Sequence, residues 1–429
     1  MGRMEHHLTT QSTRPLPVNT SVRRAPAAYD AIVVGGRCAG ASTAMLLARR
    51  GRRVLVVDRA RFPSDTLSAH SIQPGGVARL ARWGLLDRVR ATGAPFVSNV
   101  RFDVGEIALE GTPAPVDGVT DMVCARRTSL DALLFDSAAE AGAEVREGFV
   151  VQHVLFERGR AVGIAGCDAS GRRVEERASI IIGADGVRSR IALAVAAEHY
   201  FERPATTVAS YSYFADVDCH QLELYPRPGR MTIATPTNDG LTLVAQSISK
   251  ADEPTFRRDV QSAFLETLHA IPALAERVAD GTRVERFRFT TDTHGYFRVP
   301  YGPGWALVGD AGYHRDPITA QGMLDAFRDA ELLADAVDAG LERGDLATEL
   351  RGYQQLRDNS VRSMYEFTCQ LAEVDRPPAP ELQRLLADLV GNPAQISRFL
   401  GIMAGSVTVD EFFHPESLAA ISAAAPALR

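Results

Sequence analysis

The chain has 429 residues, with 47 Lys+Arg against 53 Asp+Glu, a formal net charge of -6 and 45% hydrophobic residues. This length is enough for two or three domains with a large buried core, and the composition excludes a disordered or fibrous protein. The mild acidity, without a basic block, argues against nucleic acid as a partner. Lys250 is the only lysine. Its context fits neither a Schiff base nor a P-loop, so chemistry that needs an active-site lysine is excluded, although codon usage is the simplest cause of the skew.

The cysteines and the apolar runs limit where the protein can act. Five cysteines are scattered without a CxxC pair, which predicts a reducing, cytoplasmic compartment and no structural metal. The first 27 residues are polar and lack the apolar segment of a signal peptide, so we expect a loose tail there. No apolar run approaches the roughly 18 residues of a membrane span, which predicts a soluble protein.

The hydrophobic pattern predicts alternating strands and helices, followed by a strand-rich region and a helical end. In chain order we expect a strand at 29–36, a helix at 39–50, a strand at 54–58, a helix at 126–141, antiparallel strands across 150–176, a strand at 179–183, strands across 205–300 interrupted by a helix near 256–268, a strand at 305–309, a helix at 322–340, and an amphipathic helix after Pro380. The first three elements form a β-α-β unit, which opens a parallel sheet. The leucine stripe of the last helix predicts core packing rather than a dimer surface.

A glycine-rich turn, Gly35-Gly36-Arg37-Cys38-Ala39-Gly40, joins the first strand to the first helix. Such a turn lets the backbone approach a pyrophosphate and points a helix N-terminus at it. Asp58 ends the second strand, where an acidic side chain accepts hydrogen bonds from a ribose diol. Arg37 replaces the second glycine of the usual motif, so its side chain either pairs with phosphate charge or lies in solvent. The sequence therefore predicts a dinucleotide site.

Two further motifs narrow this prediction. They are Gly183-Ala184-Asp185-Gly186-Val187-Arg188-Ser189 and Gly309-Asp310-Ala311-Gly312, the latter followed by Pro317 and Gly322. With the glycine-rich turn, and in this order over residues 28–340, they resemble the three fingerprints of the flavoprotein aromatic hydroxylases, single-component FAD monooxygenases with a p-hydroxybenzoate hydroxylase-like fold.

The resemblance implies an α/β fold: an FAD-binding Rossmann-like domain of the glutathione-reductase type with a β-sheet substrate domain and C-terminal helices. We expect a disordered tail at 1–27, a discontinuous FAD-binding domain at 28–204 and 285–375, a substrate-binding sheet domain at 205–284 and a helical cap at 376–429. FAD and NAD(P)H are the implied cofactors.

The resemblance also assigns roles to single residues. Asp310 is similar to the carboxylate that accepts a hydrogen bond from a ribityl hydroxyl of FAD, and Arg127 is similar to an arginine that reaches FAD. Asp185 is similar to a residue that serves both FAD and the nicotinamide cofactor, but an N-cap explains it equally well. The resemblance places Pro317, Gly322 and Met323 at the flavin's pyrimidine edge, where a helix N-terminus favours negative charge. The implied cofactor-binding residues are Gly35, Gly36, Arg37, Cys38, Ala39, Gly40, Asp58, Arg59, Arg127, Val151, Asp185, Gly186, Asp310, Pro317, Gln321, Gly322 and Met323.

The chain departs from the family pattern near the flavin. Tyr313 stands where the family has histidine, with His314 next, and Ala320 replaces the first glycine of the last pair. His70, His314 and Arg315 are the catalytic candidates, with a satisfied loop histidine or a surface turn as the alternatives. The aromatic residues of the strand-rich region either line a pocket or belong to the core: Tyr211, Tyr213, Phe214, Phe297 and Tyr301.

The resemblance implies reduction by NAD(P)H, oxygen addition to give a C4a-hydroperoxide, and transfer of one oxygen to an aromatic or polyketide-like substrate of secondary metabolism. Two alternatives stay open: a reductase or dehydrogenase of the geranylgeranyl-reductase type, and a non-catalytic escort module that binds FAD or a lipid. A halogenase of this fold needs an active-site lysine and paired tryptophans, whereas Trp83 and Trp305 lie far apart. The expected partners are a small-molecule substrate and O2, without nucleic acid or membrane, for a monomer or homodimer.

Overall fold

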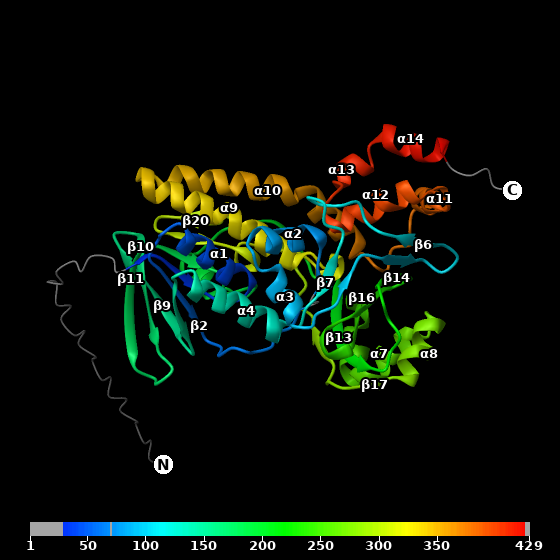
Figure 1. Cartoon of the computed structure of the whole chain (residues 1–429), viewed down its shortest axis with the longest axis horizontal. Helices are drawn as coiled ribbons and strands as arrows, with labels where there is room; N and C mark the ends of the chain where they lie inside the picture. The colour runs from blue at the N-terminus through cyan, green and yellow to red at the C-terminus, as the bar shows by residue number, and fades with distance from the viewer. Residues whose placement is uncertain (1–28, 69–70, 425–429) are drawn as a thin grey trace, which may run out of the picture.

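Two large β-sheets organise the chain, of which the computed structural model describes residues 29–68 and 71–424 (Figure 1). The first sheet has the strand order β20-β21-β11-β1-β2-β8. Its strands are β1 (Tyr29–Val34), β2 (Val54–Asp58), β8 (Glu144–Glu147), β11 (Arg173–Gly183), β20 (Tyr301–Gly302) and β21 (Trp305–Leu307). β1 runs parallel to β2 and to β11, as the predicted β-α-β unit requires. The inner strands are apolar along their length because both faces of the sheet are covered.

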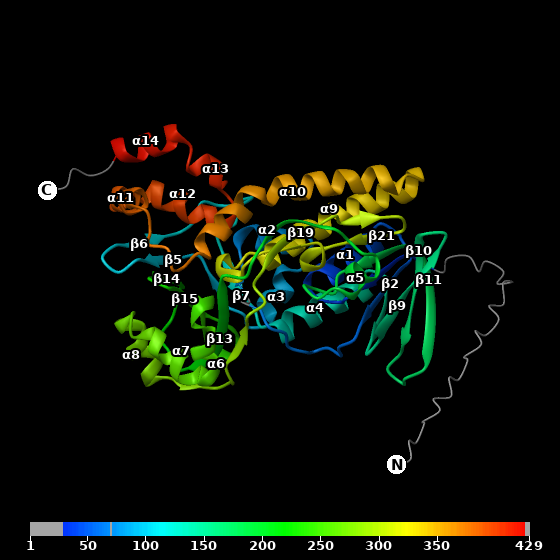
Figure 2. The same ribbon diagram turned by 180° about the vertical axis from the view of Figure 1, so that it is seen from behind.

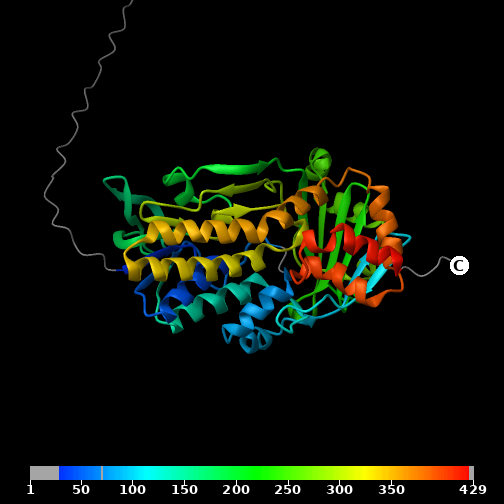
Figure 3. The same cartoon turned by 90° about the horizontal axis from the view of Figure 1, so that it is seen from above.

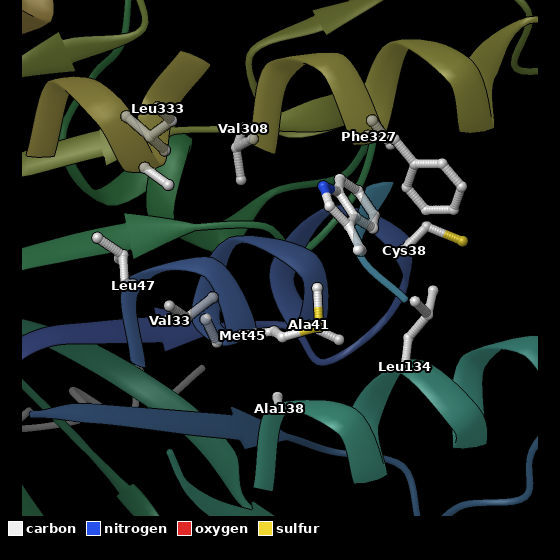
Figure 4. Close-up of a cluster of buried hydrophobic side chains, with 14 of the residues drawn as sticks. Val33, Cys38, Ala41, Met45, Leu47, Leu134, Ala138, Val308, Phe327 and Leu333 are labelled. Atoms are coloured by element: carbon white, nitrogen blue, oxygen red, sulfur yellow. The ribbon is translucent and has the colours of Figure 1, made fainter. Parts of the chain in front are cut away.

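Helices cover one face of this sheet and form the main core with it (Figure 4). They are α1 (Cys38–Arg49), α2 (Pro74–Arg82), α3 (Leu86–Ala91), α4 (Arg127–Glu140), α9 (Gly322–Arg343) and α10 (Leu346–Leu371). Val33 of β1, Met45 of α1, Leu134 of α4 and Phe327 of α9 are buried in one cluster. α10 lies alongside α9 on the outer side (Figure 3). The helices expected at 39–50, 126–141 and 322–340 are therefore present.

The other face of the sheet meets an antiparallel extension, visible at one end of the molecule in Figure 2. β11 continues beyond the first sheet and pairs with β10 (Arg160–Cys167), which pairs with β9 (Val150–Glu157). The turn at 168–171 closes because the Asp168 carboxylate accepts hydrogen bonds from the backbone N–H groups of Ser170 and Arg172. The short helix α5 (Arg190–Ala194) follows β11. The predicted antiparallel strands across 150–176 are confirmed.

The second sheet has the order β17-β13-β16-β15-β14-β5-β6, with β18 beside β13. Its strands are β5 (Val100–Asp103), β6 (Ala108–Gly111), β13 (Thr207–Ala215), β14 (Leu222–Arg227), β15 (Arg230–Pro236), β16 (Thr242–Ser249), β17 (Thr282–Arg283) and β18 (Arg288–Thr290). The sheet thus recruits residues 100–111, which lie far from 205–284 in the chain, because β5 pairs in parallel with β14. The domain boundaries given above stay a prediction.

Helices α6 (Glu253–Arg258), α7 (Val260–Leu268) and α8 (Pro272–Asp280) pack on one face of this sheet. One helix was expected near 256–268, but the structure divides it at Asp259. The Asp259 side chain accepts a hydrogen bond from the backbone N–H of Ser262, so it starts α7 as an N-cap instead of continuing α6.

Small sheets and C-terminal helices complete the fold. The small strands are β3 (Ser71–Ile72), β4 (Phe96–Val97), β7 (Met122–Cys124), β12 (His199–Arg203), β19 (Gly295–Arg298) and β22 (Tyr313–His314). The last helices are α11 (Pro380–Leu389), α12 (Pro393–Ala404), α13 (Val409–Phe412) and α14 (Pro415–Ala423), which lie over the second sheet (Figure 3). Leu386 and Leu389 of α11 are buried beside Leu222 and Leu224 of β14, so the leucine stripe is core. Within the described residues, no helix has the length and apolar character needed to cross a membrane.

Candidate cofactor and substrate site

The three glycine-containing motifs meet at the start of α1. A Cβ atom on Gly35, whose φ is +105°, would lie 2.3 Å from the carbonyl oxygen of Ala184. A Cβ atom on Gly309 would lie 2.7 Å from that of Ala39, and one on Gly40 would lie 1.8 Å from the Gly35 carbonyl oxygen. The backbones approach so closely that side chains have no room at these glycines. Three segments far apart in the sequence therefore build one site.

No side chain caps the N-terminus of α1, so the N–H groups of its first turn face outward beyond the glycine turn. Arg37 is the N-cap residue, and its side chain leaves the turn. Its guanidinium lies 2.5 Å from Asp131 of α4 and also donates to Ser64 at 2.9 Å. The Arg37 side chain is thus held by Asp131 and Ser64 and does not lie free in solvent. Pairing of Arg37 with cofactor phosphate stays a prediction.

Asp131 is the residue that joins Arg37 and Arg127. Its side chain is fully buried, and it also accepts from Arg127 at 2.9 to 3.0 Å. The Cys38 thiol lies 3.4 Å from the same carboxylate. Burial raises the pKa of Cys38 to about 12, so this thiol is neutral at physiological pH and is no nucleophile. The sequence offered one signal for Asp131, namely its position four residues after Arg127 on one helix.

Asp310 lies on the 3-10 turn Gly309–Ala311, at the end of β21, and its side chain is accessible to solvent. The Tyr296 hydroxyl donates to the Asp310 backbone carbonyl at 2.5 Å, which holds the turn in place. Asp310 follows Gly309, which lies against Ala39 of α1. A hydrogen bond between its carboxylate and a ribityl hydroxyl stays a prediction.

Asp58 holds the glycine-rich turn through hydrogen bonds. Its carboxylate accepts from the N–H groups of Gly36 and Ala60, both at 2.7 Å. Arg59 beside it is exposed, and Val151 is buried in β9, where its carbonyl accepts from Arg190. Contacts of Asp58, Arg59 and Val151 with a ribose or adenine stay predictions.

Asp185 acts as a cap in this structure. Its carboxylate accepts from the Ser189 hydroxyl at 2.5 Å and from the Arg190 backbone N–H at 2.7 Å. Burial raises the pKa of Asp185, and these hydrogen bonds oppose the rise. Gly186 takes φ +80°, with open space where a Cβ would lie. Of the two interpretations left open, the capping contact is observed, and a cofactor contact of Asp185 or Gly186 stays a prediction.

The segment after Asp310 ends at the N-terminus of α9, which no side chain caps. Pro317 starts the 3-10 turn Pro317–Thr319, and Gly322 and Met323 start the helix, with open space beside Gly322. Ala320 takes the left-handed conformation, φ +50° and ψ 38°. Ala320, which replaces the first glycine of the family's last pair, therefore adopts a backbone conformation that favours glycine.

Arg315 is buried and crosses behind this segment. Its guanidinium donates to Gln321 at 3.0 Å and to Asp325 at 2.5 Å, so it ties the turn to the first turn of α9. Its Nε and Nη1 atoms have no partner among the residues that the structure describes. The surface-turn alternative is wrong for Arg315, whereas its catalytic role stays a prediction.

Of the two candidate catalytic histidines, His314 lies within the described residues. His314 Nδ1 bonds the His294 carbonyl at 2.6 Å, so Nδ1 carries the proton, and its ring lies beside Tyr296. His70 lies outside the described residues. Catalytic roles for both stay predictions.

A cavity of about 1400 Å³ adjoins the α9 N-terminus. Its walls are β5, β14, β15 and β16 of the second sheet and the helices α10, α11 and α12. Ile318 and Ala320 line it, which connects it with the cofactor segment. The aromatic side chains on its wall are Phe102, Phe367, Phe399 and Phe413.

The aromatic residues singled out from the sequence are elsewhere. Tyr211 and Tyr213 are buried edge to face, Phe214 packs against α7, and Phe297 packs on Tyr313. None of them, nor Tyr301, lines the described cavity. Core packing is therefore the correct interpretation for them.

Lys250 is paired with Glu253 at 2.8 Å and is not among the described residues that line the cavity. Residues 29–68 and 71–424 contain no group of three or more His, Cys, Asp or Glu side chains that could hold a metal ion.

These residues fit FAD. The glycine cradle would be filled by any Cβ, two uncapped helix N-termini suit a diphosphate and a reduced pyrimidine edge, and Asp310 suits a polyol. A family model described as "FAD binding domain" matches residues 28–368. The chain belongs to this family of FAD-dependent oxidoreductases, whose members include monooxygenases, halogenases and reductases. The predicted α/β fold class is confirmed.

Relatives of this family catalyse different reactions on one fold. Digeranylgeranylglycerophospholipid reductase 2 of Methanopyrus kandleri is 26% identical over 84% of this chain and 90% of its own. The myxobacterial chondrochloren halogenase CndH has a TM-score of 0.74 at 24% identity, covering 92% of this chain and 96% of its own. The probable FAD-dependent monooxygenase pqsL of Pseudomonas aeruginosa has a TM-score of 0.67 at 23% identity, covering 81% and 96%. The fold therefore leaves the reaction open.

Proposed function

We propose that this FAD-dependent oxidoreductase is an NAD(P)H-dependent monooxygenase that hydroxylates an aromatic or polyketide-like small molecule in the cytoplasm, as a monomer or homodimer. The observation that carries the proposal is the contact between the large cavity and the cofactor segment through Ile318 and Ala320. A substrate in this cavity reaches the place where the α9 N-terminus points. Bound FAD would supply the redox chemistry, with NAD(P)H as the reductant and O2 as the oxidant.

The protein itself positions the cofactor and the substrate, and it limits the access of water to the reacting atoms. Asp310 accepts a hydrogen bond from a hydroxyl of the cofactor's ribityl chain, and the N–H groups of Gly322 and Met323 favour negative charge at the flavin's pyrimidine edge. The mostly apolar cavity wall limits the water near the reacting atoms. Lys250 supplies no cation there, which supports oxygen transfer to carbon over halogenation.

A reductase of the geranylgeranyl-reductase type is the second candidate. The similarity to the Methanopyrus reductase over most of both chains and the apolar wall of the cavity favour it. An escort module without catalysis is the weakest alternative, because a carrier needs no oriented Asp310.

The test is oxygen-dependent NAD(P)H consumption by the FAD-loaded protein over a panel of phenols and polyketides. Stimulation by a substrate, with one hydroxylated product per NAD(P)H, supports the monooxygenase. Anaerobic saturation of a substrate double bond instead supports the reductase. If the bound FAD stays oxidised when NAD(P)H and the substrates are added, the result supports the escort module.

A further inference from the structure

The inner end of the cavity lies where three helix ends meet. Gln73 is the N-cap residue of α2, Gln321 is the N-cap residue of α9, and Met403 is near the C-terminus of α12. Gln321 Nε2 donates to the Met403 carbonyl at 3.1 Å, which fastens α9 to α12. Gln73, Ala320 and Met403 all line the cavity. This end is therefore the one nearest the cofactor segment.

Gln73 carries a buried acceptor without a partner. Its side chain is 2% exposed, and Oε1 makes no hydrogen bond to any residue that the structure describes. The side chain does not cap α2, so helix formation does not require it. An unpaired buried carbonyl costs about 1–3 kcal/mol. A ligand that donates a hydrogen bond to Oε1 would remove this cost.

The rest of the cavity is large and mostly apolar, although charged residues such as Arg227, Glu373 and Arg384 also line it. Phe102, Leu224, Ile233 and Leu385 represent a wall made by strands on one side and helices on the other. Pockets for drug-sized ligands measure about 300–1,000 Å³, whereas this cavity measures about 1400 Å³. A single aromatic ring would leave most of the wall uncovered.

We infer that the substrate is an extended apolar molecule whose reacting end carries a hydroxyl or N–H group that donates to Gln73 Oε1. The inference rests on the proposed function, which defines the reacting end as the end of the substrate that is hydroxylated. The cavity selects for apolar length, and Gln73 orients the donor end toward the cofactor segment. Gln73 is thus a specificity-determining residue.

Binding can be measured apart from turnover, by calorimetry on the FAD-loaded protein without NAD(P)H. The probes are phenol, 4-butylphenol, 4-hexylphenol and 4-octylphenol, together with the methyl ether of each. Affinity should rise about three- to fourfold per added CH₂, since each buried CH₂ contributes about 0.8 kcal/mol. Each phenol should bind about tenfold tighter than its ether, which lacks the donor.

Gln73→Met removes the acceptor at similar volume and should abolish the preference for phenol over ether while the chain-length dependence persists. Gln73→Leu serves the same purpose if the first variant does not fold. Gln261→Met makes the same change at an exposed site on α7 and should alter nothing.

Affinity that is independent of chain length would overturn the extended substrate, and a preference for phenol that survives loss of Gln73 would overturn its role. Tight, length-dependent binding without any stimulated NAD(P)H consumption would instead overturn the proposed function and leave the cavity inference standing.

Discussion

The Arg37 guanidinium and the Asp131 carboxylate, 94 residues apart in the chain, lie 2.5 Å from each other across α1 and α4. Arg127 shares the same carboxylate at 2.9 Å. One buried anion thus holds two cations beside the glycine turn. Because Arg37 replaces a glycine that would normally leave this space free, Asp131 is what allows the turn to carry an arginine.

Asp131→Asn should weaken both stability and FAD binding. Removing one partner of a buried ion pair leaves uncompensated charge and costs about 3–5 kcal/mol. Urea unfolding and FAD titration of the apoprotein measure the two effects. Asp136→Asn, on the exposed face of the same helix, is the control and should change unfolding by less than about 0.5 kcal/mol. Wild-type stability of the Asp131 variant would show that the pairing is incidental.

Asp310→Ala should lower FAD affinity about 10- to 150-fold, because a hydrogen bond to a charged group contributes about 1.5–3 kcal/mol. Asp310→Asn retains an acceptor and should recover part of the affinity. Fluorescence titration of apoprotein with FAD gives both values. Unchanged affinity in the alanine variant would remove Asp310 from the site.

Ala320→Gly should raise the free energy of unfolding by up to about 1 kcal/mol, because alanine at φ +50° is strained and glycine is not. Thermal unfolding of the apoprotein is the measurement. Ala139→Gly, at an exposed position inside α4, should destabilise by about 0.5–1 kcal/mol and so give the opposite sign. A drop in stability for Ala320→Gly would contradict the strain.

Asp316 should make stability depend on pH. Burial raises its pKa, and hydrogen bonds from Thr207 and from the Ile318 N–H oppose the rise. The folded state therefore binds the proton more tightly than the unfolded state does. This stabilisation is complete below the ordinary carboxyl pKa of about 4 and is lost as the pH rises through the folded value.

Asp316→Asn removes the titration, so the variant should gain stability relative to wild type as the pH is raised from about 4 to 7. Urea unfolding at constant ionic strength across that range checks the sign. A stability difference that is flat with pH, or one that moves the other way, would contradict the raised pKa.

Much of the fold followed from local patterns. The apolar runs at β1, β2 and β11 and the helical periods of α1, α4 and α9 are local signals, and the structure contains them. The break at Asp259 was missed because an N-cap inside a helical pattern is one polar residue among several. β5 and β6 could not be assigned to the second sheet, since strand pairing across more than a hundred residues leaves no local mark.

The sequence by itself determined the family, through three glycine-containing motifs in a fixed order along the chain. Only the tertiary structure decided the partners of Arg37 and the cavity with Gln73 at its inner end. The physical reason is that ion pairs and cavities arise between side chains brought together by packing. Their identity depends on which helix lies against which sheet, and neither periodicity nor spacing along one chain records it.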